Sequence, residues 1–245
     1  MKSLSLVAPC LNEEGNIRDL VDRFLRCASE RELNVEVVLV DDGSTDSTWS
    51  VMNSLLSERG SSVVLVRHST NRGIPHGWLS GMQHASGQAV CLIDADLQNP
   101  PEVVFDLYDR FTMGDCDIVR GVRVPVAKNA RTRIVMSKTL NALLNAVFAM
   151  RSRDNKSGFV LASHQTIAEI VHHRGHYRHF QTFIGVAAHS RGFRVVEIDT
   201  PFEDRRSGFS FLEGRSWSVV SDVLRDLSEA RKEFGWRYGK GSEVR

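Results

Sequence analysis

The sequence predicts an α/β fold in which a mostly parallel sheet is covered by helices on both faces. Nearly continuous apolar runs of strand length, such as Val35–Val40 (VEVVLV) and Ala89–Ile93 (AVCLI), have the composition of strands buried on both faces. Segments with helical apolar periodicity lie between these runs. Strand and helix therefore alternate along the first half of the chain, as they do in parallel sheets.

The strands are predicted from apolar runs that end at proline or at charged residues. The first run is short because Pro9 follows it. Pro100 and Pro101 prevent the fourth apolar run from extending further as a strand. In chain order, the predicted strands are Leu4–Ala8, Val35–Val40, Ser62–Val66, Ala89–Ile93, Asp117–Arg120 and Phe193–Ile198.

The helices are predicted where apolar residues recur at intervals of three and four. Asn12 and Asp46 are the expected N-caps of the first two helices, because short polar side chains accept hydrogen bonds from the first turn. Later helices are predicted at His76–Ala85, Pro101–Met113, Gln165–His172 and Phe180–Arg191, and an amphipathic helical tail at Phe211–Tyr238.

Length and composition are those of an ordinary globular protein, and 245 residues fit one α/β domain. The formal net charge of +1 argues against a general nucleic-acid binder, which usually has a strong basic excess. The four cysteines are widely spaced and form no CxxC pair, which favours reduced thiols in the cytoplasm. No apolar run reaches the roughly 20 residues of a membrane-spanning helix. The acidic start does not match a signal peptide.

Polar loops follow three of the predicted strands, at Pro9–Glu13, Asp41–Ser44 and Asp94–Gln98. In open α/β sheets, ligands bind at the carboxyl ends of the strands. If strand geometry persists to Asp96, its side chain projects to the same side as that of Asp94. The sequence has neither the dinucleotide-binding GxGxxG nor the phosphate-binding GxxxxGK[ST]. The acidic pattern therefore favours a hard divalent cation that bridges carboxylates to a diphosphate.

Four motifs within residues 9–102 resemble glycosyltransferase family 2, whose members have the GT-A fold with a Rossmann-like sheet. They are Pro9-x-x-Asn12-Glu13-Glu14, Val40-Asp41-Asp42-Gly43-Ser44-x-Asp46-x-Thr48, Asn71-x-Gly73 and Asp94-Ala95-Asp96-Leu97-Gln98-x-Pro100-Pro101-Glu102. The last motif is most similar to the branch that transfers sugars to polyprenyl phosphates, such as dolichyl-phosphate mannose synthase and its bacterial relatives.

This resemblance implies an inverting transfer of a sugar from a nucleoside-diphosphate sugar, assisted by Mg²⁺ or Mn²⁺. The implied metal ligands are Asp94, Asp96 and Gln98, and Asp96 is also assigned to the catalytic step. Ala95 is expected to be small because a larger side chain would crowd the donor. The implied nucleotide-sugar-binding residues are Pro9, Asn12, Glu13, Asp41, Asp42, Gly73, Asp94 and Ala95.

We interpret residues 1–245 as a single GT-A domain in three parts. Residues 1–120 form the nucleotide-sugar-binding half, residues 121–210 the acceptor-binding half and residues 211–245 a C-terminal helical tail. From Arg120 to Arg153 the chain carries eight basic residues and no acidic one. In polyprenyl-phosphate transferases, basic positions of this region bind the acceptor phosphate or the leaving diphosphate. The matching residues are Arg123 and Arg133, with Ser137 at the family spacing from Arg133 and with Arg120 and Arg131 as alternatives.

The segment Arg205-x-x-Gly208-x-Ser210 is similar to the Arg-x-x-Gly-x-Ser-Lys loop of the branch, which closes over the phosphates. The resemblance implies that Arg205 adds positive charge to the leaving diphosphate. Phe211 stands where the branch usually has lysine, so one expected cation is missing at that position. Arg206 and Arg215 are the candidates to replace it.

Two acceptors stay open. A polyprenyl phosphate is favoured by the basic stretch and the Arg205 loop, and it needs no base because a phosphate monoester is largely ionised at neutral pH. A sugar hydroxyl of a glycan is favoured by the Phe211 departure, and it needs a carboxylate as general base. The candidate bases are Asp204 and Glu203, with Asp154 behind them. Asp154 lies in a segment that resembles the acidic-then-Gly-Phe segment of the family, and its other interpretation is an ordinary loop residue.

The apolar stretch Ile134–Met150 is too short to span a membrane and has basic flanks. It is interpreted either as a buried helix or as an interfacial helix on an anionic membrane. The expected location is cytoplasmic, or peripheral at the cytoplasmic face of the membrane. Two rival functions fit the sequence less well. A sugar nucleotidyltransferase would have a glycine-rich loop where this chain has PCLNEEGN. A non-catalytic nucleotide-sugar-binding scaffold would leave the Asp-x-Asp-x-Gln metal site unused.

Overall fold

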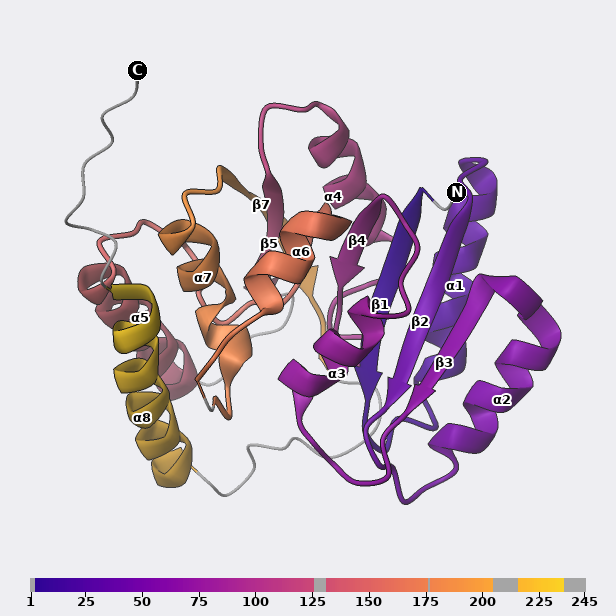
Figure 1. Cartoon of the computed structure of the whole chain (residues 1–245), viewed down its shortest axis with the longest axis horizontal. Helices are drawn as coiled ribbons and strands as arrows, with labels where there is room; N and C mark the ends of the chain where they lie inside the picture. The colour runs from indigo at the N-terminus through magenta and orange to yellow at the C-terminus, as the bar shows by residue number, and fades with distance from the viewer. Residues whose placement is uncertain (1–2, 126–130, 176, 205–215, 236–245) are drawn as a thin grey trace.

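The computed structural model describes residues 3–125, 131–175, 177–204 and 216–235, with their side chains except at 125, 131–137 and 216–221. Within these ranges a seven-stranded sheet has the order β3-β2-β1-β4-β6-β5-β7 (Figure 1). β6 is antiparallel to both neighbours, and the other pairs are parallel. The prediction of a mostly parallel α/β sheet is confirmed. The strands are β1 (Leu4–Cys10), β2 (Val35–Asp41), β3 (Val63–Arg67), β4 (Ala89–Leu92), β5 (Ile118–Pro125), β6 (Val160–Ser163) and β7 (Val195–Phe202).

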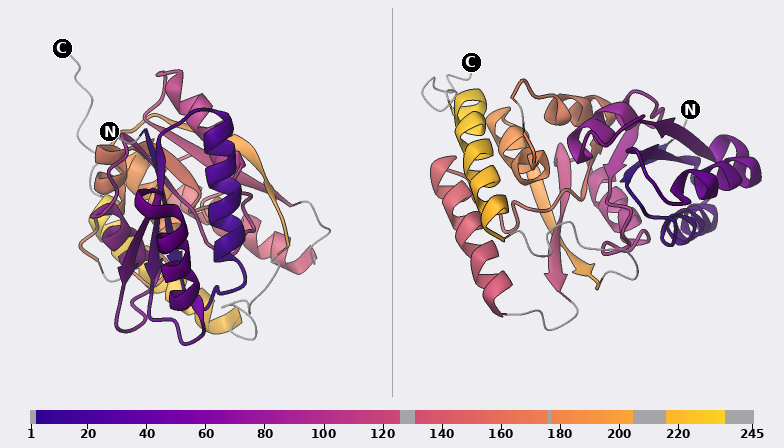
Figure 2. Two further views of the ribbon diagram at one scale, coloured as in Figure 1. Left: turned by 90° about the vertical axis from the view of Figure 1, so that its right-hand side faces the viewer. Right: turned by 90° about the horizontal axis from the view of Figure 1, so that it is seen from below.

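Helices cover both faces of this sheet. One layer consists of α1 (Ile17–Glu30), α2 (Thr48–Arg59) and α4 (Val103–Thr112). The other contains α3 (Ile74–Met82), α6 (His164–Val171) and α7 (Ile184–Ser190). α5 (Arg131–Val147) and α8 (Ser216–Phe234) also contribute to the second layer, and they lie next to each other on the side of the molecule away from β3 (Figures 1 and 2).

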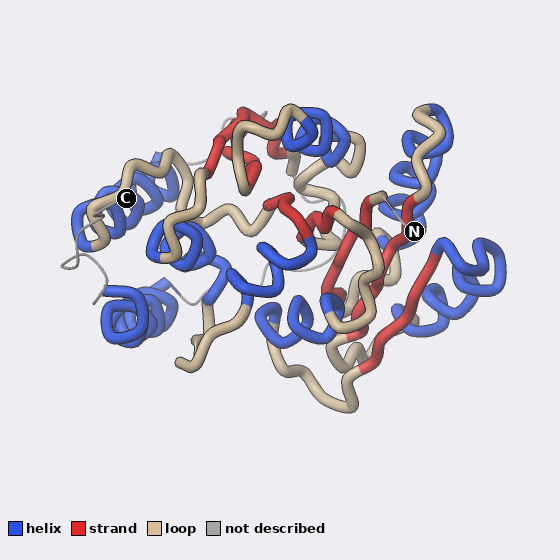
Figure 3. Tube along the Cα trace, turned by 45° about the horizontal axis from the view of Figure 1, so that its top comes forward, coloured by secondary structure: helices blue, strands red, loops and turns tan. Residues whose placement is uncertain are grey.

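The alternation of side chains along the buried strands divides the core into two apolar clusters. The helices that cover the two faces lie on either side of the red strands in Figure 3. In β1, Leu6 and Ala8 pack with α1 in the first cluster, whereas Val7 packs with α3 in the second. All of these side chains are 0% exposed. Nearly continuous apolar strands are therefore required, because both faces of the central strands are covered.

The structure adds a strand that the sequence analysis did not predict. β6 consists of four residues and forms antiparallel ladders with β4 and β5. Such a short run carries no periodicity by itself, and its burial comes from its place between two other strands. β5 and β7 are also longer than predicted, since they pair in parallel over the whole of Ile118–Pro125 and Val195–Phe202.

Several predicted element ends are wrong. Helix α1 begins at Ile17 behind Asn16, so Asn12 is not its N-cap. Helix α2 begins at Thr48, although Asp46 does accept a hydrogen bond from the Thr48 N–H at 2.9 Å. β1 continues through Pro9 to Cys10. The helix predicted at Phe180–Arg191 is a 3₁₀ turn, η2 (Phe180–Phe183), followed by α7.

The predicted apolar stretch Ile134–Met150, which overlaps α5, contributes to the core. Leu144 and Phe148 are buried in the second apolar cluster, which supports the interpretation of this stretch as a buried helix. Leu143, by contrast, is exposed. In the described ranges, no helix combines the length and the apolar composition that crossing a membrane requires.

Candidate active site

The carboxyl ends of β1, β2 and β4 form one edge of the sheet, because these strands are parallel and adjacent. The loop after β1 and the loop after β2 are joined by hydrogen bonds. The Asn12 N–H donates to Ser44 Oγ at 3.0 Å, and Asn12 Oδ1 accepts from the Thr45 N–H at 2.9 Å. The Glu13 N–H donates to Thr48 Oγ1 at 2.8 Å. Asn12, with a φ of 55°, therefore joins two of the motif loops instead of capping a helix.

The first aspartate of the β2 motif has a structural environment. Asp41 is fully buried, and its Oδ1 accepts from the Ser44 N–H at 2.9 Å. Its Oδ2 lies 3.1 Å from Nε of Arg67, whose guanidinium stacks 4.8 Å from the Trp49 ring centre. Asp41 thus fixes the turn after β2 and leaves little carboxylate surface for a ligand.

The second aspartate holds the loop that contains Gly73. Asp42 Oδ1 accepts from the Arg72 N–H at 2.9 Å, and Oδ2 accepts from the Gly73 N–H at 2.7 Å. His68 Nδ1 lies 2.7 Å from Asp42 Oδ1, and its Nε2 lies 2.8 Å from Ser80 Oγ on α3. The sequence analysis did not single out His68. Its position directly after β3, at the same edge of the sheet, is the signal that could have identified it.

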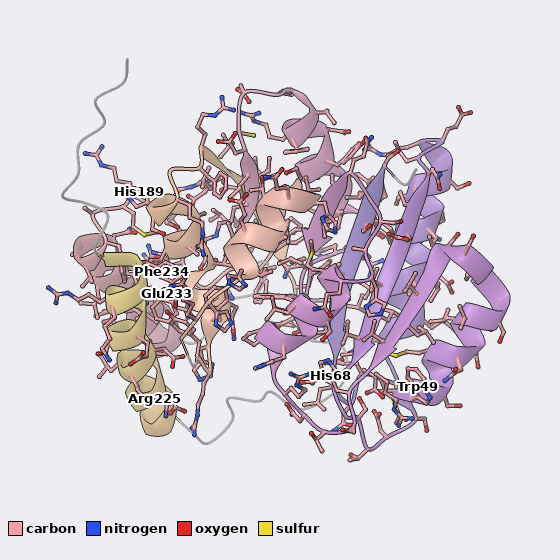
Figure 4. The ribbon with its side chains drawn as sticks, viewed as in Figure 1. Trp49, His68, His189, Arg225, Glu233 and Phe234 are labelled. Carbon is pink, nitrogen blue, oxygen red and sulfur yellow. The ribbon has the colours of Figure 1, made fainter. Side chains whose placement is uncertain are left out.

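Gly43 is needed where these loops meet. It has a φ of +78°, and a Cβ there would lie 2.6 Å from the main-chain carbon of Thr70. The neighbouring surface is hollowed by a pocket of about 510 Å³, lined by Gly43, Ser44, Thr45, Arg67, His68 and Ser69. Figure 4 shows His68 and Trp49 at this end of the sheet. The pocket has room for a base or sugar beside the motif residues.

The Asp-x-Asp-x-Gln segment leaves the sheet as an irregular turn. β4 ends at Leu92, and Leu97 has a φ of 60°, so the expected strand geometry does not persist to Asp96. Asp96 is 7% exposed, and its Oδ1 accepts from the Gln98 N–H at 3.1 Å. Ala95 and Leu97 are buried in the first apolar cluster, so core packing also limits the size of residue 95.

Gln98 connects this segment to the end of β7. The Glu203 N–H donates to the Gln98 carbonyl oxygen at 2.8 Å, and Gln98 Nε2 donates to the Glu203 carbonyl oxygen at 3.3 Å. The second bond uses the amide nitrogen of Gln98, so Oε1 is the side-chain atom that would bind a metal. This places the main chain of Glu203, one of the candidate bases, directly beside the predicted metal segment.

The donor set fits a hard divalent cation. Asp94, Asp96 and Gln98 supply carboxylate and amide oxygens on a single turn, which are the ligands that Mg²⁺ and Mn²⁺ prefer. Asn99 is 3% exposed, and its Oδ1 has no hydrogen-bond partner within the described ranges. The turn thus combines buried oxygen atoms with a local excess of negative charge, as such a cation requires.

On the acceptor side the structure brings Arg123 and Asp154 together. Arg123 Nε donates to Asp154 Oδ2 at 2.7 Å, and Nη2 donates to Oδ1 at 2.8 Å. The guanidinium also lies 5.2 Å from the ring centre of Phe202 on β7. Burial tends to raise the pKa of Asp154, but hydrogen bonds and charge from Arg123 outweigh it and hold that pKa below the ordinary 3.8. Asp154 is therefore an ionised partner of Arg123, which makes it a poor general base.

Lys156 is a second cation of this region that the sequence analysis missed. The main-chain N–H of Lys156 donates to Asp154 Oδ1 at 3.1 Å, and the Lys156 side chain is partly buried. Burial, and repulsion by Arg123, lower the pKa of the Lys156 ammonium below 10.5. Arg120, considered above as an alternative phosphate ligand, is 2% exposed, and Nη2 donates to the Asp154 carbonyl oxygen at 2.5 Å. Arg120 thus supports the loop of Asp154 from inside the fold.

Several predicted site residues fall outside the described part of the chain. These are the loop residues Arg205, Arg206, Gly208, Ser210, Phe211 and Arg215, and the side chains of Arg131, Arg133 and Ser137. Asp204, the last described residue before that loop, is exposed.

The sequence model of "Glycosyl transferase family 2" matches residues 5–174, more than half of the chain. The chain belongs to glycosyltransferase family 2. Its relatives include the undecaprenyl-phosphate 4-deoxy-4-formamido-L-arabinose transferase of Pectobacterium carotovorum subsp. carotovorum (strain PC1), 30% identical over 93% of this chain and 68% of the relative. The transferase of the same name from Proteus mirabilis (strain HI4320) is 28% identical over 94% of this chain and 69% of that relative.

Solved structures confirm the fold of this glycosyltransferase. Glucosyl-3-phosphoglycerate synthase from Mycobacterium tuberculosis, in complex with phosphoglyceric acid, superposes with a TM-score of 0.71 at 18% identity, over 96% of this chain and 80% of that chain. The same enzyme in complex with Mn²⁺, uridine diphosphate and glucosyl-3-phosphoglycerate also gives a TM-score of 0.71, at 18% identity and with the same coverage of both chains. The family and the GT-A fold predicted from the motifs are thus confirmed, whereas the roles of individual residues stay predictions.

Proposed function

We propose that this glycosyltransferase moves a sugar from a nucleoside diphosphate to a polyprenyl phosphate, with inversion at the anomeric carbon. The undecaprenyl-phosphate transferases among its relatives support this acceptor class. The observation that carries the proposal is the Arg123 guanidinium, which Asp154 orients on the acceptor side, and a pair of hydrogen bonds between Gln98 and Glu203 connects that side to the donor side. These bonds join the predicted metal turn to the end of β7, whose ladder partner β5 carries Arg123. Donor-side carboxylates and acceptor-side cations are therefore parts of one site.

On the donor side, the pocket beside Gly43 and His68 receives the nucleoside, and Asp42 positions the Gly73 loop next to it. Asp94, Asp96 and Gln98 would hold Mg²⁺ or Mn²⁺. When bound, such a cation neutralises charge that develops on the leaving diphosphate. The proposed role of these three residues is to place the two phosphates at a fixed position relative to the acceptor side.

On the acceptor side, Arg123 is oriented before any ligand binds. Asp154 holds Nε and Nη2 of Arg123, and Phe202 packs against the guanidinium. Nη1 is then directed to a phosphate oxygen, with Lys156 as the neighbouring cation. Because a phosphate monoester is already largely ionised at neutral pH, it attacks the anomeric carbon without a protein base. The acceptor is a lipid, so we place this reaction at the cytoplasmic face of the membrane.

A sugar-hydroxyl acceptor is the rival function, and the position of Glu203 beside Gln98 is the observation that favours it. That reaction needs a carboxylate within hydrogen-bond reach of the hydroxyl. The rival therefore assigns Glu203 or Asp204 as the base and predicts that neutral amide variants lose transfer.

The test is an assay of radiolabelled sugar transfer with UDP-, GDP- and dTDP-sugars, Mn²⁺, and undecaprenyl phosphate in detergent. Asp96→Asn should lower transfer by about a hundredfold, since it removes charge stabilisation of the leaving group. Asp109→Asn, which changes an exposed aspartate on α4, is the matched control and should retain activity. Glu203→Gln and Asp204→Asn should retain transfer to the lipid phosphate. Transfer to glycan hydroxyls alone, abolished by either amide variant, would replace this proposal with the rival.

A further inference from the structure

A second pocket lies on the other side of β5 from the first apolar cluster, between α7, β7 and the segment that follows α5. Its volume is about 440 Å³, and both polar and apolar side chains line it. Figure 4 shows His189, one of its lining residues, far from His68 and Trp49 at the rim described above. The lining residues are Arg120, Met150, Arg151, Ser152, Arg153, Gly185, His189, Phe193, Val195 and Glu197.

The innermost charge of this pocket is a buried arginine. Arg120 is 2% exposed, and Nη1 donates to Ser152 Oγ at 3.1 Å and lies 3.9 Å from Glu197 Oε1. Its Nε has no hydrogen-bond partner within the described ranges. A Cβ at residue 185 would collide with this guanidinium, so Gly185 is what allows α7 to cover it. The Arg120 guanidinium is thus buried while its Nε–H has no acceptor within the described ranges. Burying an unpaired charged donor is costly, and an anionic ligand would reduce that cost.

The mouth of the pocket adds positive charge. Arg153 is half exposed and pairs with Glu197 at 3.3 Å and with Asp199 at 2.7 Å. Arg151 is exposed, and no ion pair of its guanidinium occurs within the described ranges. The lining holds three arginines and one carboxylate, that of Glu197, and Asp199 outside the lining compensates Arg153. The remaining positive charge favours an anionic ligand, such as a phosphate monoester.

The rest of the lining favours an organic ligand over a bare ion. Met150, Phe193 and Val195 supply apolar side chains to the lining. His189 adds an imidazole whose pKa is lowered by burial, so that it is neutral at pH 7 and acts through hydrogen bonding. We propose that this pocket binds a phosphate monoester with a short apolar body, with Arg120 and Arg151 on the phosphate.

The proposed site is connected to the acceptor side of the active site. Arg120, at the base of the pocket, donates to the main-chain carbonyl of Asp154, whose carboxylate holds Arg123. Ser152, another lining residue, is fixed by Glu197 at 2.7 Å and by Asn145 of α5 at 2.8 Å. The site does not depend on the proposed transfer reaction, so its test uses binding.

The experiment is a calorimetric titration of the full chain with glycerol 3-phosphate, repeated with Arg151→Ala, Arg67→Ala and Arg26→Ala. We expect Arg151→Ala to weaken binding about tenfold, the effect of one charge-assisted hydrogen bond. Arg26→Ala, an exposed arginine on α1, and Arg67→Ala, which changes the first pocket, should leave the affinity unchanged. Arg151 is exposed, so its loss should not prevent folding, and an unchanged melting temperature without ligand checks this.

A second titration uses vesicles of phosphatidylcholine with and without phosphatidic acid. Binding that depends on Arg151 in this arm, with no binding of glycerol 3-phosphate, identifies the monoester as a lipid headgroup and supports the site. Binding of glycerol 3-phosphate identifies it as a soluble ester and also supports the site. The proposal is overturned if neither probe binds, if Arg151→Ala binds like the unmodified protein, or if Arg67→Ala abolishes binding.

Discussion

The carboxylate of Asp154 accepts two hydrogen bonds from Arg123, from Nε at 2.7 Å and from Nη2 at 2.8 Å. The two residues are 31 positions apart and come from β5 and from the loop before β6. This bidentate pair fixes the orientation of the guanidinium, which a single contact would leave free to rotate. It also changes the interpretation of Asp154 from a candidate base to a positioning residue for Arg123.

Asp154→Asn should destabilise the fold by about 3 kcal/mol at pH 7, because it leaves a partly buried guanidinium without its counter-charge. The pKa of Asp154 is below 3.8 in the folded protein, so its pairing stabilises the fold above the ordinary value of 3.8. This stabilisation is lost as the pH falls through the folded pKa. Urea unfolding at pH 7 and near pH 3 should show a difference between variant and unmodified protein that shrinks in acid. A difference of equal size at both pH values would contradict the assignment.

Arg123→Lys should raise the KM for polyprenyl phosphate about tenfold, since lysine cannot reproduce the planar pairing with Asp154. The KM for the nucleotide sugar should stay within about twofold, because Arg123 lies on the acceptor side. Initial rates measured with each substrate varied in turn separate these effects. A change confined to the donor KM would move Arg123 to the other half of the site.

Lys156→Met should reduce kcat/KM for the lipid phosphate about fivefold, as expected when a partly buried cation near a phosphate is removed. Lys156 lies two positions after Asp154 and is a candidate to replace the lysine absent at position 211. Lys138→Met, on the exposed part of α5, is the matched control. If both variants reduced kcat/KM equally, the loss would come from the lower net charge of the protein and not from the location of Lys156.

His68→Gln should raise the KM for the nucleotide sugar about tenfold and change kcat little. Asp42 accepts hydrogen bonds from the Arg72 and Gly73 N–H groups, and His68 is hydrogen-bonded to Asp42. Loss of the His68 imidazole therefore loosens the loop that borders the donor pocket. Ser80→Ala should have a smaller effect, because Ser80 contacts only the far nitrogen of the His68 ring. Initial rates with the nucleotide sugar varied give KM and kcat, and isothermal titration with the preferred nucleoside diphosphate checks the loss of affinity. A larger effect from Ser80→Ala would contradict this order of contacts.

Chelation by EDTA should abolish transfer, and Mn²⁺ or Mg²⁺ should restore it. A readout independent of activity is the melting temperature, which the preferred nucleoside diphosphate should raise in the presence of Mn²⁺. Asp96→Asn should lose most of that shift, while Asp109→Asn should keep it. A shift that is unchanged by both EDTA and Asp96→Asn would exclude these residues as metal ligands.

The sequence by itself determined the class of fold, the places of the central strands and the family. Apolar runs such as Val35–Val40 indicate burial on both faces, because the valine and leucine side chains on each face are favoured out of water. The motif residues of the donor side lie within a few positions of strand ends, so local pattern and chain order were enough to place them at one edge of the sheet.

Only the tertiary structure decided the position of β6, the true lengths of β5 and β7 and the partners of the charged residues. The contact between Gln98 and Glu203 spans 105 positions, and that between Asp42 and His68 spans 26. Periodicity reports which side chains are buried and not which distant residue they meet. The partner of Arg123 depends on how β5, β6 and β7 pair, and that pairing is set by packing across the whole sheet.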